Sequence, residues 1–218
     1  LVDDNSVYIG NDHSSTTRGA QYNVAVGTTA LDAITAGDYN TAVGNEALTK
    51  NTTGSYNTAS GLNALYDNTT GDYNTASGVN ALYENTTGDY NTAMGHEALK
   101  NNTQGVYNTA IGADALKNNS SGDSNIGLGY RAAYALQGGD YNIAIGYDAD
   151  FSGFYDTNSI VIGKGAIGPA SNSVTLGNSD VTAVYMAHDS GATVYAGGLN
   201  LGGTAVSSTA AELNLLDG

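Results

Sequence analysis

Acidic side chains recur at one position of a repeating pattern in this 218-residue chain. Calcium takes clustered oxygen ligands, so these carboxylates are candidate calcium ligands. The alternative is an acidic turn residue that faces water. One carboxylate per repeat falls short of a calcium coordination shell, and we therefore predict no cofactor beyond these weak candidates. The column consists of Asp38, Asp72, Asp89, Asp123 and Asp140.

Tyrosines form a second column, directly after the acidic one. Exposed aromatic rings can stack on sugar rings, so these residues are candidate glycan contacts. They could equally form a ladder of stacked rings that covers the edge of the repeats. The candidates are Tyr39, Tyr56, Tyr73, Tyr90 and Tyr107, with Tyr22 and Tyr141 in the same register.

Other chemistry finds little support in the residues. The three histidines, His13, His96 and His188, have no metal-ligand spacing, and no nucleophile elbow or phosphate-binding glycine loop is present. We therefore expect no enzymatic activity. The repeated Asn-Thr-Thr segments match the acceptor pattern for N-glycosylation, but they also suit tight turns.

Composition excludes several classes of partner. The formal net charge is −15, with six Lys and Arg against 21 Asp and Glu, which opposes binding to nucleic acid or to an anionic membrane surface. The chain contains no Cys and no run of 18 apolar residues, so the sequence predicts neither disulfides nor a transmembrane helix.

Glycine fixes the period of the chain. Ten glycines follow one another with a constant 17-residue period, and the next one in line, Gly177, closes a shorter, 14-residue repeat. A period of this length is short for two helices and suits one coil of a β-solenoid. The ten are Gly10, Gly27, Gly44, Gly61, Gly78, Gly95, Gly112, Gly129, Gly146 and Gly163.

The main strand of each coil is expected at positions equivalent to 39–43. Side chains two apart share a face of a strand, so Thr41 and Val43 lie on one face and Asn40 and Ala42 on the other. The columns of Thr41 and Val43 become apolar at both ends of the array, and we therefore predict that their side chains point into the coil. A second apolar column closes the coil from the other side: Leu31, Leu48, Leu65, Leu82, Leu99 and Leu116.

The opposite face is then predicted to contact a neighbouring chain. Its central column stays small throughout, as expected where another backbone approaches closely. The candidate trimer-interface residues are Ala42, Ala59, Ala76, Ala93 and Ala110. The regular threonine column also invites an ice-binding interpretation, which the predicted inward direction of these side chains opposes. The asparagine column that begins at Asn23 is expected to form a ladder of side-chain hydrogen bonds.

Two segments near the end of the array resemble a known coil motif. Residues 158–163, Asn-Ser-Ile-Val-Ile-Gly, and 172–177, Asn-Ser-Val-Thr-Leu-Gly, are similar to the head repeats of trimeric autotransporter adhesins of the YadA-like family. The resemblance implies a left-handed parallel β-roll, three copies of which pack around a three-fold axis as a homotrimer. The 17-residue coils look like a longer variant of that repeat.

Residues 202–218 resemble a segment found in bacteriophage tail fibres. We therefore divide the chain into a solenoid head, 1–177, and a neck, 178–218, with short strands around 181–195 and a short helix starting near 209–212. The expected function is structural and receptor-binding, in an extracellular fibre. The expected fibre is a phage tail fibre that attaches to a host receptor, for which a glycan is one candidate. The alternative is a bacterial cell-surface adhesin or matrix fibre.

Overall fold

The structure is a computed structural model that describes residues 2–3, 6–9, 19–182, 199–201 and 204–206. The chain divides into two units, 1–182 and 183–218. In the second unit the described part is an antiparallel pair, β15 (Leu199–Leu201) and β16 (Thr204–Val206). The strands predicted around 181–195 and the helix predicted at 209–212 lie almost entirely outside the described residues.

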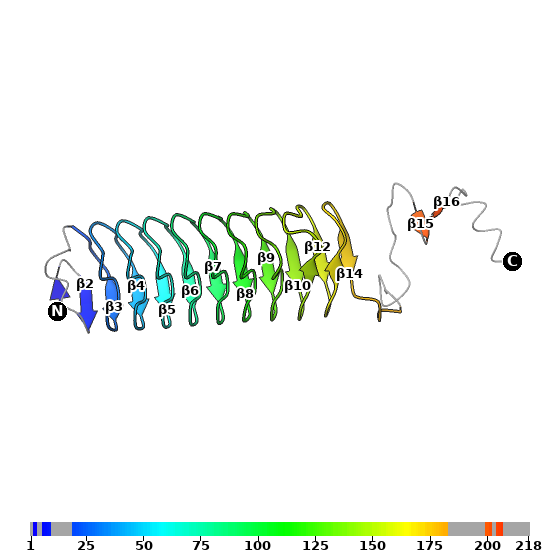
Figure 1. Cartoon of the computed structure of the whole chain (residues 1–218). Coiled ribbons are helices and arrows are strands. Elements are labelled where there is room, and N and C mark those ends of the chain that lie inside the picture. Colours follow the sequence, from blue (N-terminus) through cyan, green and yellow to red (C-terminus); the bar gives the residue numbers. More distant parts are fainter. Residues whose placement is uncertain (1, 4–5, 10–18, 183–198, 202–203, 207–218) are drawn as a thin grey trace, which may run out of the picture. The chain divides into compact units, whose positions relative to one another are not determined.

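The first unit is an all-β parallel solenoid, as the constant glycine period predicted (Figure 1). Each coil adds one short strand to a twelve-stranded sheet, in which Thr41 pairs with Thr58 of the next coil and Ile160 pairs with Val174 of the shorter last coil. Its strands are β1 (Val2–Asp3), β2 (Ser6–Ile9), β3 (Val24–Val26), β4 (Thr41–Val43), β5 (Thr58–Ser60), β6 (Thr75–Ser77), β7 (Thr92–Met94), β8 (Thr109–Ile111), β9 (Ile126–Leu128), β10 (Ile143–Ile145), β12 (Ile160–Ile162) and β14 (Val174–Leu176). All neighbours pair in parallel except β1 and β2.

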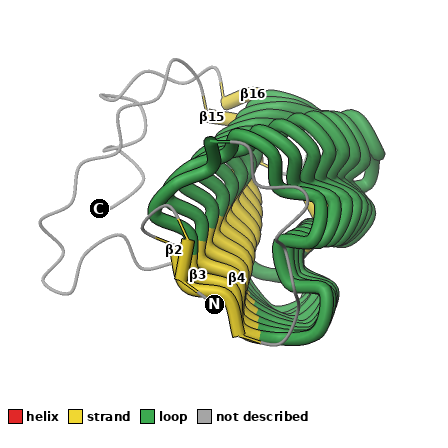
Figure 2. Tube along the Cα trace, turned by 90° about the vertical axis from the view of Figure 1, so that its left-hand side faces the viewer, coloured by secondary structure: helices red, strands yellow, loops and turns green. Residues whose placement is uncertain are grey.

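The strands form one wall of the solenoid and turns form the rest of each coil (Figure 2). A two-stranded parallel sheet, β11 (Asp150–Phe151) with β13 (Ile167–Gly168), joins the last two coils on another wall. The described residues contain no helix. Because each coil contacts only its neighbours, stability is a sum of similar terms along the axis.

The repeating glycine is required by its backbone and by its neighbour in the next coil. Gly78 has a φ of +141°, and a Cβ there would lie 2.4 Å from the carbonyl oxygen of Gly95. Three further positions in a typical coil are left-handed although they carry side chains; in one coil these are Tyr73, Asn80 and Leu82. Left-handed conformations cost an ordinary residue about 1–2 kcal/mol, so packing between coils must offset this term.

The leucine column lies inside the coil, as predicted. Leu48, Leu65 and Leu82 are fully buried, and so is the alanine that precedes each of them. This thin core continues through every coil from Ala30 to Ala149. Its small cross-section explains why a chain so poor in large apolar residues still folds.

The direction of the strand side chains was predicted wrongly. Thr58 and Ser60 are exposed, whereas Ala59 between them is fully buried, and the central residue is likewise buried in every strand of the wall from β4 to β10. The Thr41 and Val43 columns therefore point outward, and the Asn40 and Ala42 columns point into the coil. The apolar ends of the outward columns had suggested a core that they do not form.

The alanine column is consequently not a surface between chains. The predicted interface residues Ala42, Ala59, Ala76, Ala93 and Ala110 are all 0% exposed within one chain. These side chains are small because the opposite side of the same coil lies close to them, as the position where glycine replaces alanine shows. A Cβ at Gly127 would lie 3.0 Å from Cγ of Leu116, so the opposite wall of the same coil limits the side chain.

Two buried asparagine columns hold successive coils together. In the column that begins at Asn23, the side-chain oxygen accepts the backbone N–H of the next asparagine, as from Asn40 N–H at 2.8 Å. The predicted side-chain ladder is instead formed by the column at the second turn, where Asn68 Nδ2 donates to Asn51 Oδ1 at 2.8 Å. That ladder runs through Asn51, Asn68, Asn85, Asn102 and Asn119. Buried amides paired in this way satisfy their polar atoms and fix the register of the coils.

Candidate functional site

The tyrosine column forms a continuous stack. From Tyr22 to Tyr107 the ring centroids of successive coils are 4.8–5.0 Å apart, with interplanar angles of 1–13°. Each ring therefore covers the faces of its neighbours and exposes an edge. Of the two alternatives, the geometry favours the ladder, because a sugar needs a free ring face and the interior rings have none.

The ladder ends at one coil. Ser124 occupies the tyrosine position there, and the exposed fraction of the preceding ring rises from 46% at Tyr90 to 57% at Tyr107. The backbone at this position is left-handed, with a positive φ, a conformation that asparagine tolerates better than tyrosine. Asn158 and Asn172 occupy this position in the last coils. Tyrosine is thus present for its side chain rather than for its backbone preference.

The acidic column has a structural role. The N–H of Ser55 donates to Asp72 Oδ1 at 2.7 Å, and the N–H of Asp72 donates to Asp89 Oδ1 at 2.7 Å. Asp38, Asp123 and Asp140 accept equivalent bonds from the preceding coil. These carboxylates cap backbone groups at the turn, as the turn interpretation expects. The calcium interpretation stays a prediction.

One other acidic group brings potential metal ligands together among the described residues, namely His96, Glu97 and Asp114. Two lysines already occupy this position. Lys100 Nζ lies 2.7 Å and Lys117 Nζ 2.5 Å from the carboxylate oxygens of Glu97. Their hydrogen bonds, that of Lys100 first, lower the pKa of Glu97 to about 2. Two ammonium groups compensate the charge that would attract a cation, so we assign no metal to this group.

A hollowed surface lies on the flank of the solenoid that follows the leucine column. It consists of two open hollows, of about 370 and 350 Å³, which meet at Glu84. We call it the lateral groove. Its lining residues are Asn63, Asn80, Tyr83, Glu84, Lys100, Asn101, Thr103, Asn118, Ser120 and Gln137.

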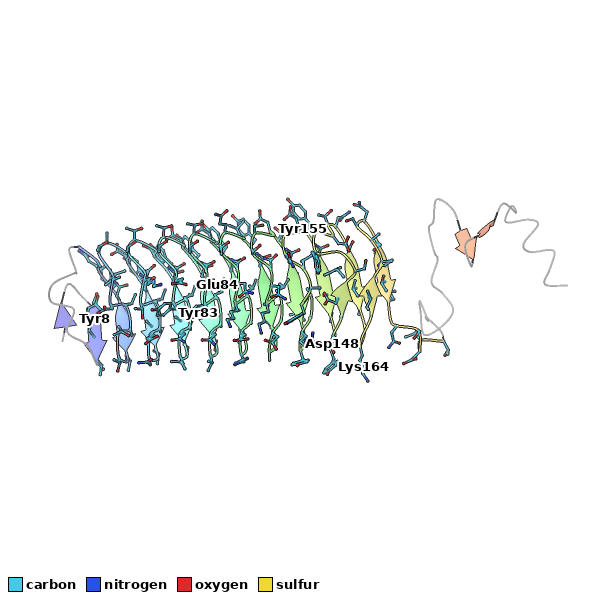
Figure 3. The ribbon with its side chains drawn as sticks, in the orientation of Figure 1. Tyr8, Tyr83, Glu84, Asp148, Tyr155 and Lys164 are labelled. Carbon is cyan, nitrogen blue, oxygen red and sulfur yellow. The ribbon has the colours of Figure 1, made fainter. Side chains whose placement is uncertain are left out.

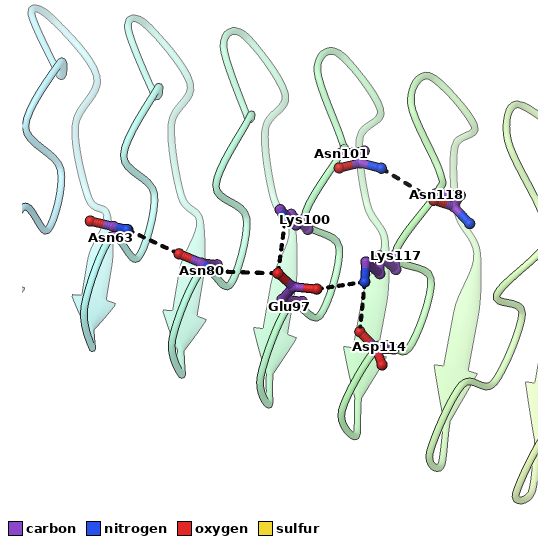
Figure 4. Close-up of polar contacts among 8 residues, drawn as sticks. All are labelled: Asn63, Asn80, Glu97, Lys100, Asn101, Asp114, Lys117 and Asn118. Atoms are coloured by element: carbon purple, nitrogen blue, oxygen red, sulfur yellow. Dashed lines mark hydrogen bonds and ion pairs between the residues drawn. The ribbon is translucent and has the colours of Figure 1, made fainter.

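Side chains from successive coils are linked along this groove (Figure 4). Asn63 Nδ2 donates to Asn80 Oδ1 at 3.0 Å, and Asn80 Nδ2 lies 3.5 Å from Glu97 Oε1. Further along the flank, Asn101 Nδ2 donates to Asn118 Oδ1 at 3.2 Å. The groove is therefore a row of ordered amides and hydroxyls with an alternating, largely compensated charge.

A second, shorter tyrosine stack borders the groove. The rings of Tyr66 and Tyr83 are 5.1 Å apart with an interplanar angle of 3°, and Lys50 Nζ lies 4.7 Å from the centroid of the Tyr66 ring. Tyr83 and Glu84 lie on adjacent positions of one coil (Figure 3). Burial, with the nearby carboxylate of Asp67 as a smaller cause, raises the pKa of Tyr83 above its usual value of 10.0.

Sequence reasoning missed the lateral groove, although its signal is present. The position two residues after the repeating glycine is polar or charged in every coil from Thr29 to Asp148, and its amides and carboxylates lie one coil apart. Reading that column, in addition to the acidic and tyrosine columns, would have located one side of the groove. The depth of the groove depends on turn geometry that the residue types do not give.

Comparison with known proteins gives no relatives. No protein-family model, no curated protein and no solved structure matches the chain. None of the described segments forms a helix with the length and apolar character needed to cross a bilayer.

Proposed function

We propose that this chain is a structural and receptor-binding segment of an extracellular fibre, in which three parallel copies with left-handed coils pack side by side. The setting that we favour is a phage tail fibre that mediates attachment to a host. The alternative setting is a bacterial cell-surface adhesin or matrix fibre. The handedness, the three-fold packing and the phage setting rest on the resemblances of residues 158–177 and 202–218.

The observation that carries the proposal is the outward face of the long sheet. In the twelve-stranded sheet, the outward positions of the strands from β2 to β14 carry no charged residue, although the chain has a net charge of −15. Several of these side chains are large, apolar and exposed, among them Ile9 at 58%, Met94 at 46% and Ile111 at 43%. A long uncharged face of this kind is typical of a surface that another protein covers.

A further copy of the same chain is the partner that fits this face best. Every copy has the same rise from coil to coil, so parallel copies stay in register over the whole length of the sheet. The Thr and Ser side chains in the middle of the face are short and permit close approach, while the Ile and Val side chains at its ends supply apolar area. The chain contact is thus reassigned from the alanine column to the outward strand positions.

Native mass spectrometry of the purified chain tests this proposal. One chain has a mass of 22.1 kDa, and a trimer is expected at three times that mass. Thr75→Arg places a charge on the outward face and is expected to shift the population to monomer at micromolar concentration. Thr70→Arg is the matched control, because Thr70 is an exposed threonine on a turn away from that face. A folded monomer in the parent protein, or equal behaviour of the two variants, would overturn the trimer.

The orientation of the strand wall also favours a second candidate, ice binding. The objection to that interpretation was that the threonines point inward, and in fact Thr58 and Thr75 are exposed on the outward face. Regular hydroxyl and methyl groups one coil apart could order water. Thermal hysteresis of the parent protein, lost in Thr75→Arg, would support this candidate. Hysteresis absent at millimolar concentration would exclude it.

A further inference from the structure

We propose that the lateral groove binds an uncharged polysaccharide that lies along the solenoid axis, with the ring of Tyr83 stacked on one of its sugars. This inference rests on the proposed receptor-binding function and names the chemistry of the receptor and the residues that contact it. It also moves the glycan contact away from the exposed ladder of Tyr39 to Tyr107, whose inner rings have no free face.

Tyr83 is the one ring of its stack that borders the groove. On the other side, the Tyr66 ring lies between Tyr83 and the ammonium of Lys50, so both faces of Tyr66 are covered. In the next coil the position of Tyr83 is held by Lys100. The ammonium of Lys100 binds Glu97 of its own coil at 2.7 Å, whereas that of Lys50 reaches into the next coil, where it binds Asp67 at 2.6 Å and lies over Tyr66. The Tyr83 ring is half-buried, is backed by the Tyr66 ring and lines the hollow, an arrangement that suits stacking on a sugar.

The rest of the groove supplies hydrogen-bonding groups that sugars use. Asn101 commits one N–H to Asn118, and its side-chain oxygen makes no hydrogen bond within the described residues. Thr103 and Ser120 donate their hydroxyl protons to the backbone of the following coil, which leaves their oxygens as acceptors toward the groove. Sugar hydroxyls donate and accept, so they can pair with both kinds of group.

Repetition gives the groove an extended shape. Its lining runs from Asn63 to Gln137, which lie four coils apart and thus about 19 Å along the axis at a sheet spacing of about 4.8 Å. That length accommodates several sugar rings in a row. Hydrogen-bonding groups recur at every coil along this length. A linear polymer therefore fits better than a single small molecule.

Charge selects an uncharged polymer over an acidic one. Within the lining, Glu84 is anionic and Lys100 cationic, and the network of Glu97 with its two lysines lies beside them. No excess of positive charge is available within this lining to attract carboxylates or phosphates, and the whole chain is strongly acidic. An anionic polysaccharide would be repelled at long range, whereas a neutral one would not.

Isothermal titration calorimetry with defined sugars tests the inference. The probes are hexamers of β-1,4-linked glucose, α-1,4-linked glucose and β-1,4-linked N-acetylglucosamine, with polygalacturonate as the anionic comparison. We expect at least one neutral hexamer to bind and polygalacturonate not to bind. No binding of any neutral hexamer at millimolar concentration, or preferred binding of polygalacturonate, would overturn the inference.

Variants locate the binding in the groove. Tyr83→Ala should weaken it at least about tenfold, and Asn101→Ala with Asn118→Ala by a similar factor, through lost hydrogen bonds. Tyr83→Phe keeps the ring and should bind within about threefold of the parent. Tyr73→Ala is the matched control, since it removes a stacked tyrosine on another flank. Unchanged affinity in both groove variants would refute the site, even if one of them folded less well.

The mass of the same samples separates this inference from the proposed fibre. A trimer that binds none of the neutral hexamers refutes the groove site and leaves the fibre intact. A monomer whose binding depends on Tyr83 supports the groove site and refutes the trimeric fibre.

Discussion

Replacing Asn85 by leucine should test how far the buried asparagine ladder contributes to stability. Asn85 Nδ2 donates to Asn68 Oδ1 at 2.7 Å, and Asn85 Oδ1 accepts from Asn102 Nδ2 at 2.8 Å. All three residues are 0% exposed. The substitution therefore leaves one carbonyl oxygen and one N–H buried without a partner in the middle of the solenoid.

The magnitude follows from those two groups. A buried polar group without a partner costs about 1–3 kcal/mol, and burying a leucine side chain in place of the amide returns about 1 kcal/mol. The expected net loss for Asn85→Leu, which leaves two such groups unpaired, is about 1–5 kcal/mol. Apolar residues are compatible with this position, because the chain itself carries Ile34 and Leu136 in the same column, both fully buried.

Those natural substitutions define the matched control, Asn119→Leu. Asn119 is the last member of the ladder before Leu136, and its Oδ1 is already buried without a hydrogen bond. Leucine at 119 removes that unpaired oxygen and leaves Oδ1 of Asn102 unpaired in its place. The ladder becomes one residue shorter at little cost, and the expected change is within about 1 kcal/mol.

Urea unfolding followed by circular dichroism measures both variants against the parent, at one protein concentration so that any effect of the proposed association is the same for all three. The informative quantity is the difference between the two substitutions, which introduce the same side chain into the same column. Equal loss of stability, or a larger loss at 119, would show that ladder hydrogen bonds do not govern the cost.

Three further changes follow from features of single coils. Gly78→Ala should cost about 3 kcal/mol or more, because its Cβ would meet a carbonyl oxygen at 2.4 Å. Gly165 is also left-handed, but the nearest atom to its added Cβ lies 4.0 Å away, so Gly165→Ala should cost only about 1 kcal/mol by urea unfolding. The pKa of Glu97 is lowered from 4.5 to about 2, so its ionised carboxylate contributes about 1–3 kcal/mol to the free energy of unfolding above pH 4.5, and this contribution is lost as the pH falls toward 2. Glu97→Gln should remove this pH dependence of stability, and an unchanged dependence would contradict the lysine network. Tyr73→Asn loses two stacked neighbours and should lower the melting temperature, while Tyr141→Asn, beside the gap in the ladder, should leave it unchanged or raise it. A larger fall in melting temperature for Tyr141→Asn than for Tyr73→Asn would show that backbone preference outweighs stacking.

The architecture could be predicted from the sequence because it depends on a period. Glycines at a constant 17-residue spacing require a unit that repeats with that length, and the buried leucine column followed from its regular apolar character. The shorter coil before Gly177 was likewise predicted from spacing, and it is observed as the pairing of Ile160 with Val174. Local patterns of this kind specify the coil without any knowledge of distant contacts.

The inner and outer faces could not be assigned in the same way. Both faces of the strand contain small or β-compatible residues, and a one-residue difference exchanges them. Apolar residues such as Ile143 and Ile145 suggested a core, but the coil is too thin to hold two columns of that size opposite the leucines. Alanine at the central position is the signature of that thin interior, and it had been interpreted as a contact with another chain.

The hydrogen bonds between coils lie along the axis of the solenoid, and this direction determines how the first unit should respond to a pulling force. Tension applied between its ends acts on the coil boundaries in series, and because each boundary can open by itself, the coils should release singly rather than all at once. A released 17-residue coil extends to about 58 Å, at about 3.4 Å per residue, from a rise of about 4.8 Å. Each step would therefore lengthen the molecule by about 50 Å while the remaining coils stay folded. A single-molecule force trace should show a regular sawtooth with that increment. The first unit would then absorb mechanical energy in a series of equal unfolding steps.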